Sequence, residues 1–374
     1  MEAILPVADK ADHASRAHAE FSMSSLGRVI ACPLSYTLSK GVPRTTNEFA
    51  ERGTLMHECG EAKILTGKLP TLPEGADPLT KDELEIVNIY VDYINGLKDS
   101  DNMIWWKLEH KVKVNDQCWG TADGVVITQE DDSTVLYIID LKTGFISVEP
   151  DCSQLKGYAL GVLKDVANIA EPSVVRCVIV QPKDLTAVKT FDWTADEVWS
   201  FEKVIDDTIA SATGDNPSWS VGDHCRWCPA APTCTKIFEE IEMATKDDDI
   251  DLGKALHLAT IAENWAKRVR QQAESDLKCG KPVPGWKLVR GRSLRKWMDI
   301  PDVHDHLESL LREEAFEKKY ISPTQAEKLI GKEHFKDTPL AEYVIKPEGK
   351  ITIAPESDKR QAVATENDLF DALD

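Results

Sequence analysis

The sequence predicts an α/β fold, because its hydrophobic period changes several times between that of a helix and that of a strand. Apolar residues recur at helical spacing over 80–98 and then alternate with polar residues over 106–114. Helical spacing returns over 151–167, and an apolar strand pattern follows over 173–181. The order helix, three strands, helix, strand is typical of one α/β core.

Local patterns place the other elements along the chain. A Ser-rich start predicts a capped helix over 21–40, and Pro and Gly break the chain over 69–78. A second capped start is expected at Ser322. The full set is helices over 21–40, 48–66, 80–98, 151–167, 195–212, 254–279 and within 301–345, strands over 106–114, 119–128, 134–141 and 173–181, and a strand pair within 280–300.

These elements predict three parts of the chain. Residues 1–243 form the α/β core, and residues 244–348 form a mainly helical extension with a basic segment. The acidic tail, 349–374, is expected to be disordered because it is polar and charged.

Composition limits the class of protein. Hydrophobic residues make up 42% of the 374 residues, enough for a sizeable core, and no apolar run approaches the ~20 residues that cross a bilayer. The N-terminus lacks the apolar segment of a signal peptide, so we expect a soluble, cytoplasmic protein without a membrane partner. A net charge of −20 argues against indiscriminate binding to nucleic acid, but it is compatible with a local basic groove and with a carboxylate site for divalent cations.

Three short motifs bring carboxylates, an imidazole and a lysine together on this core. His57 and Glu61 lie four apart on a predicted helix, so they share one face. Asp123 lies in an apolar strand, within GTADG. Asp140 and Lys142 lie two apart on the next strand, within IIDLKTG, and therefore point the same way.

Such a set suits phosphodiester hydrolysis. Two carboxylates and an imidazole bind hard divalent ions such as Mg²⁺ or Mn²⁺. The metal polarises a phosphoryl oxygen and lowers the pKa of bound water, while a lysine orients that water or offsets charge in the transition state. Each motif alone is weak, since an acid at a strand end is usually solvated, but their joint order is far less expected by chance.

With a fourth motif, Gln154-x-x-x-Tyr158, the set resembles the RecB-family branch of the PD-(D/E)XK nucleases. The resemblance implies a restriction-endonuclease-like core with flanking helices. It implies His57, Asp123, Asp140 and the Leu141 carbonyl as metal ligands and Lys142 as the catalytic lysine, with His57 and Glu61 in the catalytic set, Gln154 and Tyr158 near the DNA, and Glu109 as a weaker candidate.

Nine cysteines, an odd number without a signal peptide, do not indicate a disulfide framework. Three of them form Cys225-x2-Cys228-x5-Cys234, and Cys32 is the obvious fourth ligand. A structural zinc site, which His224 could complete, is one interpretation. The spacing also resembles the iron–sulfur staple of AddB and of CRISPR-associated RecB-like exonucleases, which implies a [4Fe–4S] cluster that closes the core.

The segment between 264 and 296 has ten basic and two acidic residues, a net charge of +8, with Trp286 and Trp297 nearby. It would suit a path for single-stranded nucleic acid, or it is a solvated helix face with two core tryptophans. The DNA-binding set expected here is Lys287, Arg290, Arg292, Arg295 and Lys296.

The N-terminus, this segment and the late KPEGKITIAPESDKRQAV also resemble a group of phage-encoded RecB-like proteins. That resemblance implies a role in phage DNA replication or recombination. Together with the RecB-family motifs, it predicts a Mg²⁺- or Mn²⁺-dependent deoxyribonuclease, an exonuclease on single-stranded or resected DNA ends. The partners expected besides DNA are a single-strand-binding protein, a helicase or a polymerase. The chain has no G-x-x-x-x-G-K-[ST] loop, so any unwinding must come from a partner. The alternative is a non-catalytic DNA-binding or assembly module that keeps the fold.

Overall fold

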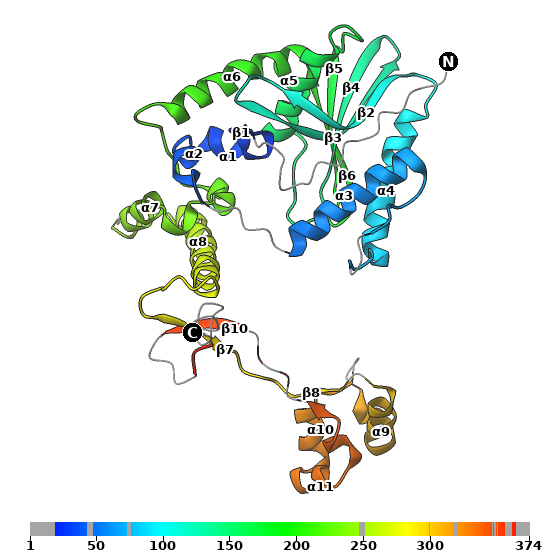
Figure 1. Ribbon diagram of the computed structural model, residues 1–374, viewed down its shortest axis with the longest axis vertical. Helices are drawn as coiled ribbons and strands as arrows, with labels where there is room; N and C mark the ends of the chain where they lie inside the picture. The colour runs from blue at the N-terminus through cyan, green and yellow to red at the C-terminus, as the bar shows by residue number, and fades with distance from the viewer. Residues whose placement is uncertain are drawn as a thin grey trace, which may run out of the picture. The chain divides into compact units, whose positions relative to one another are not determined.

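A mixed six-stranded sheet organises the N-terminal part of the protein in the computed structural model (Figure 1). Its strands are β1 (Phe21–Ser22), β2 (Met103–Lys113), β3 (Cys118–Glu130), β4 (Ser133–Leu141), β5 (Val174–Val180) and β6 (Val188–Thr194). β2, β3 and β4 form an antiparallel meander, β4 runs parallel to β5, and β6 returns antiparallel to β5. The short β1 pairs in parallel with the start of β3. The predicted α/β class is therefore confirmed as a mixed α/β architecture.

The structure describes residues 19–42, 48–72, 76–246, 251–298, 300–316, 320–345, 347, 349, 351–355 and 361–363. The chain divides into two compact units, Met1–Ala262 and Glu263–Asp374. This boundary falls inside the long helix α8 (Leu252–Lys278), not at the expected junction of residues 243 and 244.

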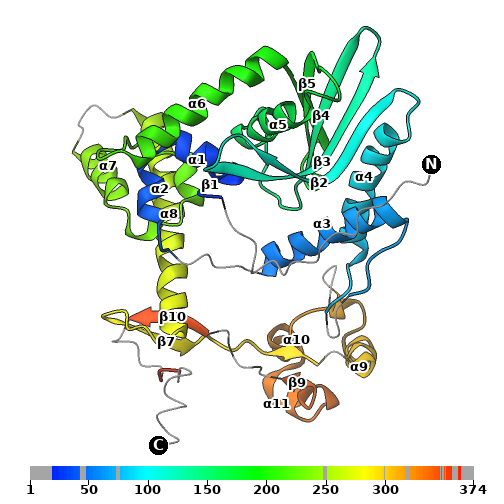
Figure 2. The same cartoon turned by 45° about the horizontal axis from the view of Figure 1, so that its top comes forward.

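Helices cover both faces of the sheet in the first unit. α3 (Glu48–Thr66) and α4 (Lys81–Lys98) lie on one face, and α5 (Ser153–Val166) and α6 (Ala195–Thr213) lie on the other (Figure 2). β4 serves both layers because successive strand side chains point to opposite faces. Leu136 and Ile138 join the core under α5 and α6, whereas Val135, Tyr137 and Ile139 join the core under α3 and α4.

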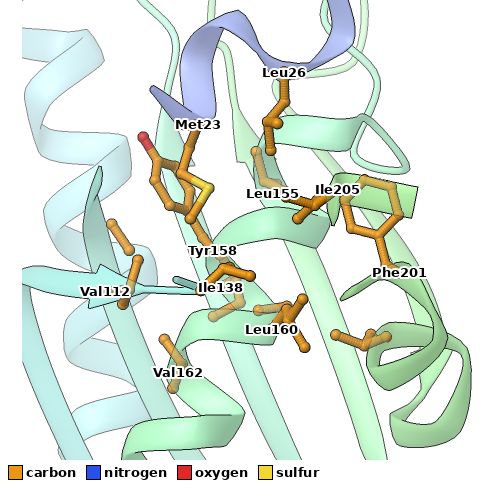
Figure 3. Close-up of a cluster of buried hydrophobic side chains, with 14 of the residues drawn as sticks. Met23, Leu26, Val112, Ile138, Leu155, Tyr158, Leu160, Val162, Phe201 and Ile205 are labelled. Carbon is orange, nitrogen blue, oxygen red and sulfur yellow. The ribbon is translucent and has the colours of Figure 1, made fainter. Parts of the chain in front are cut away.

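The core under α5 and α6 is the larger of the two. Leu155 and Leu160 of α5 meet Ile205 of α6 and Ile138 of the sheet, all fully buried (Figure 3). Burying each such side chain contributes about 1.5–3 kcal/mol, so α5 is firmly fixed against the sheet. α5 also carries Gln154 and Tyr158, which the sequence predicts to lie near DNA.

Side-chain caps define where two of these helices begin. Thr80 and Glu83 form a reciprocal capping box at the start of α4, and Thr194 and Glu197 form one at the start of α6. Each box satisfies backbone N–H groups that would otherwise lack partners. The third box, at Ser322 and Gln325, confirms the capped start predicted there.

The predicted single helix over 21–40 is wrong. This segment forms the 3₁₀ helix η2 (Met23–Ser25) and two short helices, α1 (Leu26–Ala31) and α2 (Leu34–Ser39). The break falls at Cys32, whose backbone leaves the helical region (φ −142°, ψ 86°) before Pro33. Proline disfavours helical geometry in the residue before it, which accounts for the break.

Strand β6 was not predicted from the sequence, although its last four residues, Phe191–Thr194, alternate apolar and polar residues. Its burial is slight, so the alternation carries little hydrophobic contrast. After α6 the first unit continues through η3 (Asp223–Trp227), η4 (Ala231–Thr233), α7 (Thr235–Thr245) and the start of α8.

The second unit has its own small core, formed by residues such as Val303, Leu307 and Phe335. Its elements are β7 (Trp286–Arg290), β8 (Lys296–Trp297), α9 (Pro301–Leu311), η5 (Arg312–Ala315), α10 (Pro323–Ile330), α11 (Lys332–Lys336), η6 (Pro339–Ala341), β9 (Val344–Ile345) and β10 (Ile351–Pro355). The region predicted as helical over 301–345 is thus confirmed as a set of short helices.

Two expectations for this unit are wrong. The strands within 280–300 do not pair with each other: β7 pairs with β10, and β8 pairs with β9. The tail from 349 is not wholly disordered, because β10 is a strand and Val289 forms a further bridge with Ala362. Residues 364–374 lie outside the described residues. None of the helices that the structure describes has the length and apolar character to span a bilayer.

Candidate metal centre

Asp140 and Lys142 lie at the end of β4, as their spacing predicts. The Lys142 backbone N–H donates to the Val180 carbonyl (2.9 Å), which continues the pairing of β4 with β5 past the end of the strand. Lys142 Nζ lies 2.7 Å from Asp140 Oδ2, and the Asp140 side chain is only 4% exposed. Among the described residues Oδ2 nevertheless accepts no well-aligned hydrogen bond. A carboxylate oxygen has more than one lone pair, so Oδ2 could accept a cation in addition to the Lys142 ammonium group.

Gln154 of α5 connects this pair to Tyr158. Its Oε1 accepts a hydrogen bond from Lys142 Nζ (3.3 Å), and its Nε2 donates to Asp140 Oδ1 (3.3 Å) and to the Tyr158 hydroxyl (3.2 Å). One amide therefore uses its acceptor and both donors within the site. The four side chains that the sequence motifs singled out on β4 and α5 form one hydrogen-bonded network.

Asp123 of β3 contacts both the neighbouring strand β4 and the helix α3. Its Oδ2 accepts a hydrogen bond from the Leu141 backbone N–H (3.0 Å) and lies 3.3 Å from His57 Nδ1. His57 projects from α3, so the helix–strand juxtaposition expected from the motifs is present. Leu141 itself contributes this N–H, and a role for its carbonyl on a metal stays a prediction.

Glu109 belongs to the same site, although the sequence made it only a weaker candidate. The β2–β3 register pairs Leu108 with Gly124 and His110 with Ala122, which sets Glu109 opposite Asp123. One ligand atom each from His57, Glu109 and Asp123 lie within 4.8 Å of one another. An imidazole nitrogen and two carboxylates at this separation are a donor set that fits a divalent cation.

The backbone at Glu109 is unusual, with φ at +44°. A non-glycine residue in this region costs of order 1–3 kcal/mol. The burial pattern of β2 changes phase here: Leu108 joins the core under α3 and α4, whereas Val112, an even number of residues later, joins the core under α5 and α6. The strained Glu109 thus reverses the face of the sheet to which the side chains of β2 point. This reversal occurs at the residue that lies near His57 and Asp123.

Burial and like charge act together on Asp123. Burial, with the nearby Asp140 carboxylate, raises the pKa of Asp123 to about 6. Burial by itself would lower the pKa of Lys142, but the Asp140 and Asp123 carboxylates raise it above its ordinary value, so the lysine stays charged. Burial and the same carboxylates also raise the pKa of Tyr158. An excess of buried negative charge is what a cation would offset.

Two residues of this environment were not found from the sequence. Tyr90 of α4 is 3% exposed, and burial followed by the charges of Asp123, Glu109, Asp140 and Glu61 raises its pKa. Thr143 lies against α3, because a Cβ built on Gly53 would stand 3.1 Å from its Oγ1. Helix spacing alone marks Tyr90 as a core residue, so no signal separated it from its neighbours.

Glu61 does not belong to the group of three ligand atoms formed by the described residues. It lies one turn beyond His57 on α3, and its charge acts on Tyr90. Its predicted place in the catalytic set stays a prediction.

The comparison with protein families identifies the chain by sequence. A family model described as "Protein of unknown function (DUF2800)" matches residues 18–361. The chain belongs to the DUF2800 family. Among solved structures it is similar to the crystal structure of SSO0001, with 13% identity, 60% of this chain and 90% of that chain covered, and a TM-score of 0.28.

Hydrogen bonds join the two distant segments that carry the cysteine set of this DUF2800 protein. The Ser220 hydroxyl donates to the Ala31 carbonyl (2.6 Å), and the Leu34 N–H donates to the Ser218 carbonyl (2.9 Å), on either side of Cys32. Cys32 and Cys228 are both buried. The segment that precedes Cys225 is therefore fixed to the turn that carries Cys32.

Within the described residues, no three cysteine sulfurs meet within 4.8 Å of one another. His224, the alternative zinc ligand, is engaged with the Ser220 carbonyl (3.1 Å), and a hydrogen bond with Cys225 raises its pKa.

The basic set of the second unit is only partly available to a ligand. Arg290, Arg292 and Lys296 are exposed, and Lys287 is half-buried. Arg295 is half-buried and forms an ion pair with Glu327 of α10. Trp297 Nε1 donates to the Ile321 carbonyl (2.7 Å) and its ring packs on the unit's core, so Trp297 is not an open stacking platform. Trp286 is 45% exposed.

A cavity of about 450 Å³ lies beside β6 and the loop after β4. Glu149, Asp151 and Lys189 line it, and His57, Glu109 and Asp123 do not. Lys189 is already paired with Glu149 (2.9 Å) and Asp184 (2.8 Å). This cavity is thus separate from the candidate metal centre.

Proposed function

We propose that this protein is a Mg²⁺- or Mn²⁺-dependent nuclease of the PD-(D/E)XK type that hydrolyses DNA phosphodiester bonds. The observation that carries the proposal is the convergence of His57, Glu109 and Asp123 on one small volume beside the Asp140–Lys142 pair. These residues come from three strands and a helix, so the grouping depends on the fold and not on one local motif.

The residues divide the chemistry among them. His57, Glu109, Asp123 and Asp140 would hold the cation, which supplies polarisation of a phosphoryl oxygen and a bound water of lowered pKa. Lys142 stays positively charged next to Asp140 and is suited to offset charge that develops on the phosphate. Gln154 holds Lys142 and Asp140 in register and, with Tyr158, borders the network on the α5 side.

The substrate class follows from resemblance and from charge. By resemblance to RecB-family nucleases, we propose exonuclease action on single-stranded or resected DNA ends, in replication or recombination of a phage type. The protein's net charge of −20 means that DNA must be attracted locally. The region of Lys287, Arg290, Arg292 and Lys296 in the second unit is our candidate for that attraction, without Arg295, which pairs with Glu327.

We also propose that Cys32, Cys225, Cys228 and Cys234 hold a [4Fe–4S] cluster with a structural role, with zinc as the alternative. The hydrogen bonds on both sides of Cys32, which join it to the segment before Cys225, support this assignment. Such a cluster would connect the start of the sheet domain to the segment after α6.

The test is cleavage of end-labelled single- and double-stranded DNA with Mg²⁺ or Mn²⁺. Wild type should produce a ladder of products, and Asp140→Ala and Lys142→Ala should each reduce the rate at least a hundredfold. Asp132→Asn, an exposed turn residue of the same hairpin, is the control. Binding of DNA without cutting by wild type, on both substrates and with both metals, would favour the non-catalytic binding or assembly module.

A further inference from the structure

We propose that Phe145 is a stacking platform for an unpaired nucleobase next to the candidate metal centre, an assignment that rests on the proposed nuclease function. Phe145 follows Lys142 by three residues and is 76% exposed. A large aromatic side chain in water forgoes the stabilisation that burial gives, so its exposure beside a site for DNA calls for an explanation.

The backbone that carries Phe145 is fixed on both sides. Gln181, fully buried, donates through Nε2 to the carbonyls of Gly144 (2.9 Å) and Ile146 (2.7 Å). Its Oε1 accepts a hydrogen bond from the Val148 N–H (3.0 Å). One buried amide thus holds the residues before and after Phe145, and the ring projects outward from a fixed loop.

A second set of contacts fixes the same loop to its neighbour. The Ser147 hydroxyl donates to Asp184 Oδ2 (2.7 Å), and Lys189 Nζ donates to Ser147 Oγ (2.8 Å) and Asp184 Oδ2 (2.8 Å). The loop after β4 and the β5–β6 loop therefore form one cross-linked rim. A preorganised ring loses less conformational freedom on binding than a mobile one.

Charge next to the ring favours a nucleotide over an apolar partner. Lys183 Nζ, on the β5–β6 loop, lies over one face of the Phe145 ring, 4.7 Å from its centroid, and is exposed, so a stacked base would use the other face. An aromatic face beside a cation matches a base and its phosphate, the combination by which proteins hold single strands. Because Lys142 and Gly144 are both bonded to the Val180–Gln181 end of β5, the platform and the lysine share one support.

The experiment measures binding, so that it does not depend on cutting. Fluorescently labelled single-stranded oligonucleotides, intact or with one abasic nucleotide at each successive position from the end, are titrated by anisotropy in Ca²⁺. Wild type should bind about tenfold more weakly when one particular position is abasic, the order of magnitude of one base–aromatic stack. Phe145→Ala should bind intact DNA about tenfold more weakly and lose the preference for that position.

Two variants sharpen the comparison. Phe145→Trp should keep the positional preference, because it keeps a stacking face. Trp199→Ala should leave binding unchanged: Trp199 is a 40% exposed aromatic near the start of α6, at the end of the sheet opposite Lys142. An abasic penalty of equal size in wild type and Phe145→Ala, or none in wild type, would overturn the stacking assignment. If the wild-type protein shows the abasic penalty but does not cut DNA, the proposed nuclease function is wrong and the stacking assignment for Phe145 stands.

Discussion

Asp123 combines burial with a charge that its surroundings disfavour. Its side chain is 15% exposed, and burial with the neighbouring Asp140 raises its pKa to about 6, above the ordinary 3.8. Between pH 3.8 and about pH 6, the Asp123 carboxyl group is protonated in the folded protein and ionised in the unfolded chain. The free energy of unfolding therefore falls as pH rises from about 4 to about 6 and stays reduced above that range.

Replacing this carboxylate should stabilise the metal-free protein. Asp123→Asn keeps an oxygen for the Leu141 N–H and removes the buried charge, so we expect the free energy of unfolding at pH 8 to rise by about 1–2 kcal/mol. At pH 4 the gain should vanish. Urea denaturation in EDTA at both pH values measures it, and a variant less stable than wild type at pH 8 would refute this account of the charge cluster.

At the residue scale, the sequence predicted what depends on local spacing. Asp140 and Lys142 lie two apart on a strand, and the structure brings them within 2.7 Å. Glu109 was a weaker candidate for the site from the sequence. Its position depends on strand register and on a positive φ, and a period-two pattern reveals neither. Gln181 gave no sequence signal at all, since its role appears only when the loop of Phe145 folds over it.

Among the elements, α3 carries His57 and is held to α4 by an ion pair. Arg52 Nε donates to Glu83 Oε1 (3.0 Å), and the second guanidinium nitrogen bonds the other carboxylate oxygen. Arg52 holds the pKa of Glu83 at about 2, well below the ordinary 4.5. This pair thus stabilises the fold above pH 4.5 and loses its effect as pH falls through about 2.

Glu83→Gln isolates that charge, because glutamine still supports the capping box with Thr80. We expect a loss of about 1–2 kcal/mol at pH 7, more than a surface pair gives because the pair is largely shielded from solvent. The loss should shrink as the pH approaches 2. Chemical denaturation of the variant and of Glu85→Gln, an exposed carboxylate of the same helix, makes the comparison. Equal losses in the two variants would contradict a specific α3–α4 pair.

Element order was predicted well where the hydrophobic contrast is strong. The central helices and strands from α3 to α5 appear within a few residues of their expected bounds. β6 was missed because its side chains are mostly exposed, and the helix over 21–40 was divided by the conformation that Pro33 imposes on Cys32. The partners of β7 and β8 lie more than forty residues away along the chain, and such pairing cannot be read from either strand alone.

Across the whole molecule, the proposed cluster would close a loop from Cys32 to Cys234 around the sheet. Cys32→Ser should therefore lose bound iron and reduce the free energy of unfolding by about 3 kcal/mol or more. Cys279→Ser, at an exposed cysteine outside the set, is the matched control and should change neither. Iron content and visible absorbance after anaerobic purification measure the outcome. Stoichiometric zinc in place of iron would establish the alternative metal.

The measurement that tests the central claim most directly is Mn²⁺ binding to the metal-free protein, followed by electron paramagnetic resonance. If the group of His57, Glu109 and Asp123 is a divalent-cation site, Glu109→Gln and Asp123→Asn should each weaken binding at least tenfold, the scale on which loss of a metal's supporting groups acts. Asp132→Asn should bind as wild type does. Equal Mn²⁺ affinity in all four proteins would contradict the metal centre and, with it, the proposed nuclease.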